Sequence, residues 1–419
     1  MPSAQRRRVA SGIARTRMRP RAAQARGRSG ALHSHAQTIT STITAFTAIG
    51  ALVFTGLSLN ATRDQVAAAH RQNEVAQQGQ FTERYTRAVE QLDQSGPDHL
   101  QTRLGGIFAL QRLAEDSPRD QPTIINVIET FITATVARGN VDTCPEGVAP
   151  DIQAALSVAI DRNREHDESD PLAGMDLSGA CLAKSDLGNA DFRQVNLTNA
   201  DLRSANLRHA ELTRGTFNGA TLIDADLRNA DLGNSSLVGA TLCRADLDEA
   251  NLQQVSFLRA DLHLASLNDT NLQDASLIDA QLTHVGLQNS NLSQASLGRA
   301  NLGSAYADGA NFSGAHLGEA QLFSASLQNA KFTDAGLGGT NLRKANLSGA
   351  DFRQARLVQA SLREAVLVGA DLSSAVLLQT DLTAADLRDA NLDGVDLSTT
   401  KQGYPDAHDV VPYRKTKGC

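Results

Sequence analysis

The chain has 419 residues, 39 of them Lys or Arg and 46 of them Asp or Glu, which gives a formal net charge of −7 at pH 7. This balance excludes a strongly basic protein that holds nucleic acid by charge, so we expect no nucleic-acid partner. The charge is uneven along the chain. Residues 1–62 carry nine Arg and no acidic residue, whereas residues 63–169 and 170–400 are both acidic.

The N-terminal region combines a basic segment with an uncharged one. No Asp, Glu, Lys or Arg lies between Arg28 and Arg63, and residues 39–59 form a run of apolar, Gly and Thr character that is long enough to span a bilayer. We predict a basic, disordered segment over residues 1–36 and a transmembrane helix over residues 37–62, with the lipid bilayer as its partner. The expected anchor residues are Ile39, Phe46, Ile49, Leu52, Val53, Phe54, Leu57 and Leu59.

Two alternatives remain for this uncharged segment, a signal-peptide core and a soluble apolar helix. The run is long for a signal peptide, and no small-x-small cleavage site follows it cleanly. The nine preceding arginines favour a cytoplasmic N-terminus by the positive-inside rule, although Arg63, Arg71, Arg84 and Arg87 lie on the other flank. We therefore expect a single-pass plasma-membrane protein whose C-terminal region lies outside the cytoplasm.

Residues 63–140 change to a helical period. Three apolar stripes recur at intervals of three or four residues, and Ser95-Gly96-Pro97 and Asp116-Ser117-Pro118 separate them. We predict a small α-helical linker module, whose middle helix resembles those of HEAT or armadillo repeats. The stripes are Phe81, Tyr85, Ala88, Val89 and Leu92, then Leu100, Leu104, Ile107, Phe108 and Leu113, then Ile124, Ile128, Phe131, Ile132 and Val136.

From Leu172 to Leu397, Leu or Phe occupies every fifth position, and Ala307 is the single exception among 46 positions. On an α-helix, five residues advance about 140° beyond a full turn, so these side chains would form no single buried face. In a flat strand, they would alternate between the two faces of the sheet. The period therefore predicts that residues 170–400 form an all-β solenoid, which turns once per pentad and directs each central residue toward a shared axis.

The residue two before each centre is small, most often Ala, as expected near a crowded inner corner. The residue between them is often Asp or Asn, whose short side chains bond local backbone at turns. This A(D/N)LXX pattern, as in Ala190-Asp191-Phe192, resembles the pentapeptide-repeat family. The resemblance implies a right-handed, four-sided β-helix with four pentads per coil. Residues Gln80–Ile132 also resemble the segment that links a membrane anchor to the repeats in bacterial members.

Four pentads per coil would stack every fourth pentad in one column, so the core can be assigned by column. At Ala307 the core lacks volume, and its bulky neighbours Tyr306 and Phe312 are candidates to compensate. The predicted structural core residues are Leu172, Leu397 and six phenylalanines that fall in only two of the four columns, with Phe192, Phe312, Phe332 and Phe352 in one and Phe217 and Phe257 in the other.

Each end of a solenoid exposes unpaired strand edges, which invite aggregation unless another element covers them. An amphipathic helix over residues 151–163, in the linker of residues 141–169, is placed to cap the first coil. The C-terminal tail of residues 401–419 is short and contains Pro405 and Pro412, so it does not promise a robust cap. The family resemblance implies that a homodimer can form through this end.

The residue types that usually carry chemistry form no recognisable site. The cysteines Cys144, Cys181, Cys243 and Cys419 lack zinc-site spacing, and Cys181 and Cys243 fall in different columns, so we expect free thiols. Histidines and carboxylates follow the repeat register, without a combined nucleophile, base and orienting group. We predict no enzyme activity, no catalytic residue, no metal and no cofactor.

Two functions remain. The first is a membrane-anchored rod that presents a rigid surface to an unidentified protein partner, or acts as a spacer. Positions 281–330, with only Arg299, Asp308 and Glu319 as charged residues, form a neutral belt that suits protein contact, although a solvated polar surface explains it equally well. The alternative, implied by the resemblance, is a DNA mimic that inhibits or protects DNA gyrase. Duplex DNA about 55 Å long carries roughly 32 negative charges, whereas residues 170–400 have a net charge of only −11.

Overall fold

The computed structural model describes residues 32–139, 142–162 and 174–401, with side chains from residue 46 onward. Residues 1–31 of the expected basic segment, the side chain of Ile39, the core residue Leu172 and the tail after Lys401 therefore lie outside the described residues, whereas residues 32–36, which were expected to be disordered, are helical. The chain divides into two compact units, residues 1–79 and residues 80–419, which are treated separately below.

In the first unit, the expected anchor lies within helix α1, which runs Leu32–Leu92 and continues into the second unit. Hydroxyl groups along this helix are bonded within it, since Thr55 donates to the carbonyl of Ala51 at 2.6 Å. The apolar side chains that the structure describes there are all exposed: Phe46, Ile49, Leu52, Val53, Phe54, Leu57 and Leu59. None of the described helices has the length and hydropathy needed to cross a bilayer.

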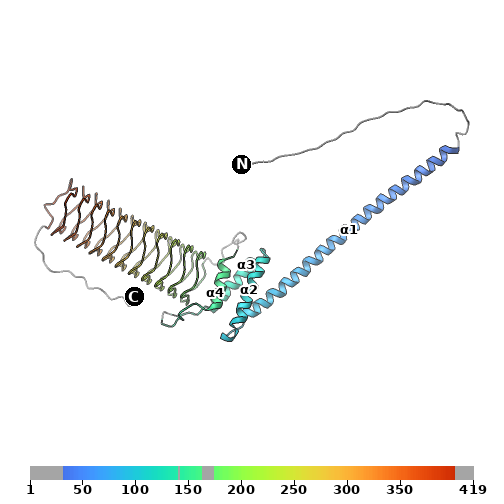
Figure 1. Ribbon diagram of the computed structural model, residues 1–419, viewed down its shortest axis with the longest axis horizontal. Coiled ribbons are helices and arrows are strands. Elements are labelled where there is room, and N and C mark those ends of the chain that lie inside the picture. Colours follow the sequence, from blue (N-terminus) through green and yellow to red (C-terminus); the bar gives the residue numbers. More distant parts are fainter. Residues whose placement is uncertain (1–31, 140–141, 163–173, 402–419) are drawn as a thin grey trace, which may run out of the picture. The chain divides into compact units, whose positions relative to one another are not determined.

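The second unit begins with a small helical module (Figure 1). It comprises the end of α1, a short 3-10 helix η1 (Pro97–His99), α2 (Leu100–Asp116), α3 (Gln121–Thr135) and α4 (Pro150–Ile160). α2 approaches α1 closely at Gly106, where a Cβ atom would lie 2.7 Å from the carbonyl of Ala88. The expected stripe was wrong at Phe108, which is 54% exposed, because α2 buries the faces of Ile107 and Leu110 instead.

After the module, the chain winds into a four-sided coil (Figure 1). Its sides are joined by parallel bridges between equivalent positions of successive coils, as between Asp186 and Asn206. In most pentads, the central amide donates to the next coil and the following turn closes on the same residue. The amide of Leu187, for example, donates to the carbonyl of Asn206 at 2.8 Å, and the amide of Ala190 donates to the carbonyl of Leu187 at 3.2 Å. These contacts confirm the all-β solenoid, and the small helical module is present as expected.

From the first described corner to Gly394, each corner of the coil has one residue with positive φ. The residue two after the pentad centre has φ between about 54° and 78°, both where it is Gly, as at Gly349 (φ 68°), and where it is bulky, as at Arg259 (φ 58°) and Leu264 (φ 60°). A positive φ at the third residue is the mark of a type II turn, and it costs free energy in a non-Gly residue. Non-Gly residues are therefore tolerated at most corners because the backbone hydrogen bonds between coils and the packed interior offset this cost.

The inner surface is packed with the predicted core. All six phenylalanines are fully buried, and the rings of Phe312, Phe332 and Phe352 stack with centroids 4.9 and 4.8 Å apart in successive coils. Tyr306 does not compensate for Ala307, because its side chain occupies an outward bridge position and is 52% exposed. Phe312, the other candidate, is fully buried at the centre of the next pentad.

Threonine replaces alanine at some inner corners, where its hydroxyl is hydrogen-bonded, whereas the buried hydroxyls of Ser185 and Ser235 have no protein partner. Thr340 donates to the carbonyl of Leu317 at 2.7 Å, and Thr380 donates to that of Leu357 at 2.6 Å. Both side chains are fully buried. A hydrogen-bonded hydroxyl can therefore stand in an otherwise apolar column at little cost.

Elements from the helical module cover the edge of the first described coil. Arg138 forms an antiparallel bridge with Ala180, which adds a short strand to the open edge. On α4, the side-chain amide of Gln153 donates to the carbonyl of Asp186 at 2.9 Å and accepts from its N–H at 2.8 Å. Gln153 thus replaces a peptide group of a neighbouring strand, which is how α4 protects this edge.

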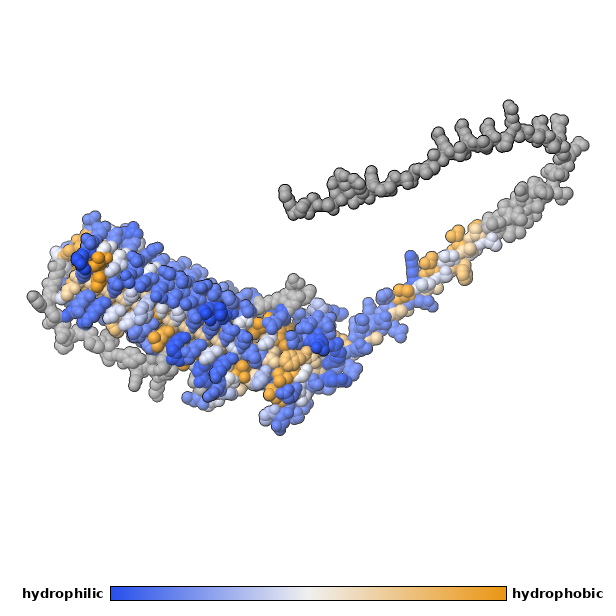
Figure 2. Space-filling model, in the orientation of Figure 1, coloured by the Kyte–Doolittle hydropathy of each residue, from blue (hydrophilic) through white to orange (hydrophobic). Residues whose placement is uncertain are grey.

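The opposite end of the coil is more open. Inward residues of the last described coil are only partly buried, among them Leu387, Leu392, Val395 and Leu397. In the face shown in Figure 2, apolar atoms are visible at this end of the rod. Partly covered core residues next to a terminal strand edge form a surface suited to association.

Candidate interaction surface

A disulfide joins the linker to the first described coil. Cys144 and Cys181 are bonded, with Cα atoms 5.3 Å apart, and the amide of Cys181 also donates to the carbonyl of Ala137 at 2.7 Å. Cys243 is disulfide-bonded as well. The expectation of free thiols was therefore wrong for Cys181 and Cys243, because it compared only cysteines of the repeats and did not follow the linker back onto the coil.

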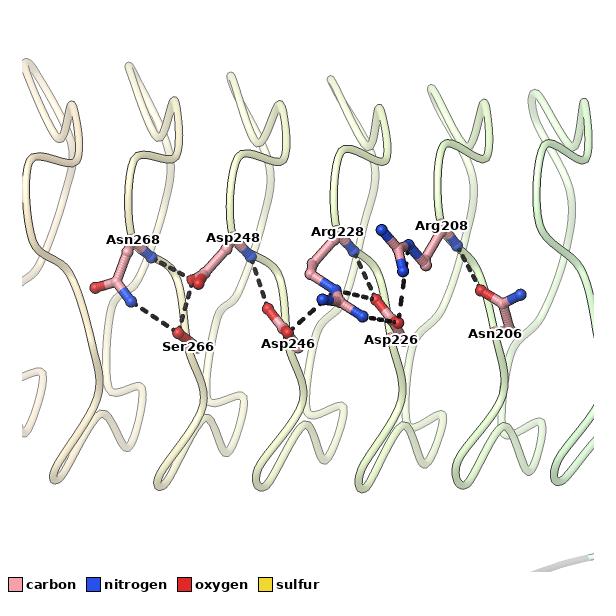
Figure 3. A network of polar contacts seen from close by, with 8 residues as sticks. All are labelled: Asn206, Arg208, Asp226, Arg228, Asp246, Asp248, Ser266 and Asn268. Atoms are coloured by element: carbon pink, nitrogen blue, oxygen red, sulfur yellow. Dashed lines mark hydrogen bonds and ion pairs between the residues drawn. The ribbon is translucent and has the colours of Figure 1, made fainter.

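One side of the rod carries a ladder of arginine, aspartate, asparagine and serine side chains that are linked from coil to coil (Figure 3). Asp226 accepts from Nε of Arg228 at 2.9 Å, and the same nitrogen lies 3.2 Å from Asp246 in the next coil. Farther along, Asp248 accepts from the Ser266 hydroxyl at 2.6 Å and from the backbone N–H of Asn268 at 2.8 Å. We call the eight residues of this network the charged ladder: Asn206, Arg208, Asp226, Arg228, Asp246, Asp248, Ser266 and Asn268.

Arginine pairing holds many of the rod's carboxylates in the ionised form. The hydrogen bond from Arg228 lowers the pKa of Asp226, although partial burial opposes the shift. The same kind of bond lowers the pKa of four further carboxyl groups. They are Asp224 beside Arg244, Asp279 beside Arg299, Asp351 beside Arg353 and Asp386 beside Arg388. The negative charge of these groups is largely neutralised by a guanidinium within hydrogen-bonding distance.

A different side of the rod carries no charge on its flat surface. It is formed by two outward columns, one from Asn196 to Gly336 and one from Thr198 to Gly338, each continued by one residue per coil. We call these two columns together the neutral face. Its members are Asn196, Thr216, Ser236, Ser256, Ser276, Ser296, His316 and Gly336, then Thr198, Asn218, Val238, Leu258, Ile278, Gly298, Gly318 and Gly338.

The neutral face contains an apolar stripe and a groove. Val238, Leu258 and Ile278 follow one another in adjacent coils, and the groove begins where Gly298 follows Ile278 in that column. It encloses about 660 Å³ and ends at Val358, with Arg299 and Arg356 at its rim. A flat surface with a charge-free centre, apolar contacts and a charged rim has the layout of a protein interface.

Neither the backbone nor close packing requires the glycines that form the groove floor. A Cβ atom on Gly298 or Gly318 would lie 3.9 Å from the carbonyl of the next coil, which is an ordinary contact, and neither residue has positive φ. Gly303 on another side differs, because a Cβ atom there would lie 2.5 Å from the Phe323 ring. The glycines of the groove therefore affect the outer shape of the rod more than its folding.

The structure brings the predicted core residues together along one axis, but it forms no compact site from them. Leu397 is the least covered of the described set, because it lies in the last coil. In the part of the chain that the structure describes, no three His, Cys, Asp or Glu side chains cluster as metal ligands.

The neutral face extends over more coils than the neutral belt expected from residues 281–330. It runs along one side of the rod instead of encircling it. The signal was present in the sequence, because sorting residues by their remainder modulo 20 separates the four sides. A linear count of charges mixes all four sides of each coil. It therefore identified only the coils in which every side happens to carry little charge.

Comparison with known proteins places the repeats clearly. Two models of the same repeat match, the pentapeptide repeat region over residues 172–242 and pentapeptide repeats in copies between residues 225 and 400. Together they span more than half of the chain. No curated protein matches.

Several solved structures are similar over the repeats. HetL of the cyanobacterium Nostoc sp. strain PCC 7120, a pentapeptide repeat protein involved in heterocyst differentiation regulation, is 35% identical; the match covers 47% of this chain and 89% of HetL, with a TM-score of 0.46. QnrB1, a plasmid-mediated fluoroquinolone resistance protein, is 20% identical over 46% of this chain and 90% of its own, with a TM-score of 0.31. A pentapeptide repeat protein of the Arabidopsis thaliana thylakoid lumen is 31% identical over 27% of this chain and 68% of its own, with a TM-score of 0.11.

Proposed function

Because the chain belongs to the pentapeptide-repeat family, we propose that it is a membrane-anchored, non-enzymatic protein whose rigid rod presents a surface to a protein partner. The neutral face carries this proposal, since it combines an apolar stripe, a groove and eight coils without charge on one flat side. Interface centres are depleted of charged residues. A surface that only contacts water would not need its charged residues to be confined to other sides of the rod. A spacer role for the same rod remains compatible with this geometry.

The exposed apolar part of α1 supports a membrane anchor. Seven large apolar side chains between Phe46 and Leu59 are each more than half exposed and have no protein core of their own. The Thr and Ser residues of this segment keep its hydropathy below that of an ordinary membrane span, but their hydroxyls donate to carbonyls within the helix. A bilayer would therefore remove the exposed apolar surface from water without leaving these hydroxyls unpaired. The anchor would insert through residues 37–62, with the arginine-rich segment before it in the cytoplasm and the repeats outside.

The disulfides support the same orientation. Cys144–Cys181 and the disulfide of Cys243 are stable in oxidising compartments, whereas the cytosol keeps most structural thiols reduced. The charge asymmetry is a property of the sequence and the cysteine pairing a property of the structure, so the two observations are independent. Their agreement favours a rod outside the cytoplasm.

Orientation can be measured by labelling two introduced cysteines in intact cells. We expect a membrane-impermeant maleimide to label Gln288→Cys, which is exposed on the rod, and to leave Ser11→Cys unlabelled until the cells are permeabilised. Both positions lie away from the native cysteines in sequence. The opposite labelling pattern would show that the repeats are cytoplasmic and would end this part of the proposal.

Partner binding can be tested on the neutral face. A photo-crosslinker at Ser276 is expected to capture a specific protein in intact cells, and Gly318→Arg should weaken this capture about tenfold by placing charge in the groove. Gly318 tolerates a Cβ atom, so the rod should fold normally. Gln288→Arg, an equivalent charge on the side with the charged ladder, is the matched control. Equal capture by both variants would exclude the neutral face as the interface.

The alternative of a gyrase-directed DNA mimic is less well supported. Such a mimic needs unpaired carboxylates at phosphate spacing, and the charged ladder instead pairs Asp226 and Asp246 with one arginine. Cytoplasmic repeats, together with inhibition of gyrase supercoiling by the purified protein, would favour this alternative. A homodimer through the open C-terminal end is a separate proposal, which the partly buried Leu392 and Leu397 support.

A further inference from the structure

The neutral face is complementary in shape to a reversed copy of itself. In the column from Thr198 to Gly338, three coils carry partly exposed apolar side chains, and the next three coils carry glycine. We call these two sets the ridge and the floor: the ridge is Val238, Leu258 and Ile278, and the floor of the groove is Gly298, Gly318 and Gly338. They are equal in length, because each spans three coils at a spacing of about 4.8 Å. A second rod that runs in the opposite direction would therefore place its ridge on this floor and receive the first ridge on its own floor.

The corner beside this column carries charges with the same symmetry. Its four charged residues alternate in sign along the rod, in the order Arg259, Asp279, Arg299 and Glu319. Nε of Arg299 lies 2.8 Å from Asp279 within the chain. The midpoint of the row falls between these two residues, in the same two coils where the ridge ends and the floor begins. Reversing the row about this midpoint therefore places an opposite charge against every member.

We propose that the partner of the neutral face is a second copy of this chain, which docks in the antiparallel direction. This inference rests on the proposed function, because it takes the neutral face to be a protein interface. The two-fold axis would lie in the plane of the interface and across the rod, between the coil of Ile278 and the coil of Gly298. Leu258 of each copy would then lie on Gly318 of the other. Each contact occurs twice, as in any isologous interface.

The charges and the ridge together select this register over its neighbours. With the axis as proposed, Arg259 of each copy faces Glu319 of the other, and no like charges meet along the corner. An axis through the last coil of the ridge would place Asp279 against its own counterpart, and an axis through the first coil of the floor would do the same to Arg299. Displacement by a full coil avoids this repulsion, but it sets part of the ridge on the ridge or part of the floor on the floor.

Photo-crosslinking between two differently tagged full-length copies in intact cells tests the docking. A photo-crosslinker in place of Ser256, in the other column of the neutral face, should link to the second copy near His316, which faces it in this register. After trypsin digestion of the dimer that carries both tags, we expect peptide 245–259 to be joined to peptide 300–331. The same photo-crosslinker in place of Gln288, on another side of the rod, should give no linked dimer.

Charge variants test the register without changing the ridge or the floor. Arg259→Glu would oppose two carboxylates in each of two contacts, and Glu319→Arg would oppose two guanidinium groups. Either variant by itself should therefore reduce the yield of linked dimer about tenfold. A mixed pair, with Arg259→Glu in one copy and Glu319→Arg in the other, has opposite charges at both contacts and should recover the yield. Each chain still carries its own single substitution, so this recovery cannot arise from better folding of either chain.

The results that would overturn self-association are distinct from those that would overturn the proposed function. A dimer linked through other peptides, or a mixed pair that recovers nothing, would show that the antiparallel register is wrong. A different protein linked at Ser256 in place of the second copy would exclude self-association and leave the neutral face as an interface. If neither Ser256 nor Ser276 yields any linked protein, both this inference and the proposed function are wrong.

Discussion

Replacing Phe332 with alanine is expected to lower the free energy of unfolding by about 3–5 kcal/mol. The Phe332 ring is fully buried between those of Phe312 and Phe352, at centroid distances of 4.9 and 4.8 Å. Its removal leaves a cavity that the ladder of backbone bonds prevents from closing, because the coil spacing is fixed on all four sides. Urea unfolding followed by far-ultraviolet circular dichroism measures the loss.

Phe323→Ala is the matched control, since it removes the same side chain from an outward position that is 43% exposed. We expect a loss of less than about 1 kcal/mol there. Each coil contacts only its neighbours. Phe332→Ala should therefore also split the unfolding of the rod into two transitions, in which the C-terminal coils unfold first. Equal losses for the two variants would contradict the assignment of the Phe312, Phe332 and Phe352 column to the core.

The rod could be predicted in detail because its contacts repeat. Once the five-residue period is known, the family resemblance implies a coil of four pentads, with which the columns of Phe192 and Phe217 agree, and each side chain is placed by its position in the pentad. The same local geometry recurs at every coil, so no long-range information is needed. The helical module was predictable for a related reason, since its stripes and the breaks at Gly96 and Pro118 are local signals.

Features that depend on the path of irregular chain could not be predicted in this way. The bond between Cys144 and Cys181 requires the linker to return to the first coil, and no local pattern encodes that return. Positive φ at corner residues such as Arg259 and Leu264 was also hidden, because neither residue type favours that conformation. Tyr306 misled the prediction since its size suggested a core role, whereas its place in the pentad points it outward.

Breaking the ion pair between Arg103 and Asp151 is expected to detach the cap from the rod. Nε of Arg103 donates to Oδ2 of Asp151 at 2.6 Å, and the two side chains are only 14% and 7% exposed. Arg103 also donates to the carbonyl of Gly96 at 2.7 Å, so it connects α2, the loop before it and the start of α4. Asp151→Ala leaves the guanidinium buried without this carboxylate, a change that costs about 3–5 kcal/mol.

The loss of stability should be confined to the helical module and to the end of the rod that α4 covers. α4 holds Gln153 against Asp186, so loosening α4 exposes the strand edge of the first coil. Hydrogen exchange is expected to increase in residues 150–160 and in the first coil, without a change in the middle of the rod. Light scattering should show end-to-end association of the variant at concentrations where the unmodified protein stays dispersed.

Asp116→Ala provides the control, because Asp116 pairs with Arg84 at 3.3 Å with both side chains about half exposed. That pair should contribute about 0–1 kcal/mol, and its loss should leave the cap in place. A double variant, Arg103→Met with Asp151→Leu, should restore much of the stability, because it removes the isolated buried charge along with its partner. If Asp151→Ala leaves hydrogen exchange in α4 unchanged, the ion pair does not hold the cap, and the side-chain amide of Gln153 and the strand at Arg138 must do so by themselves.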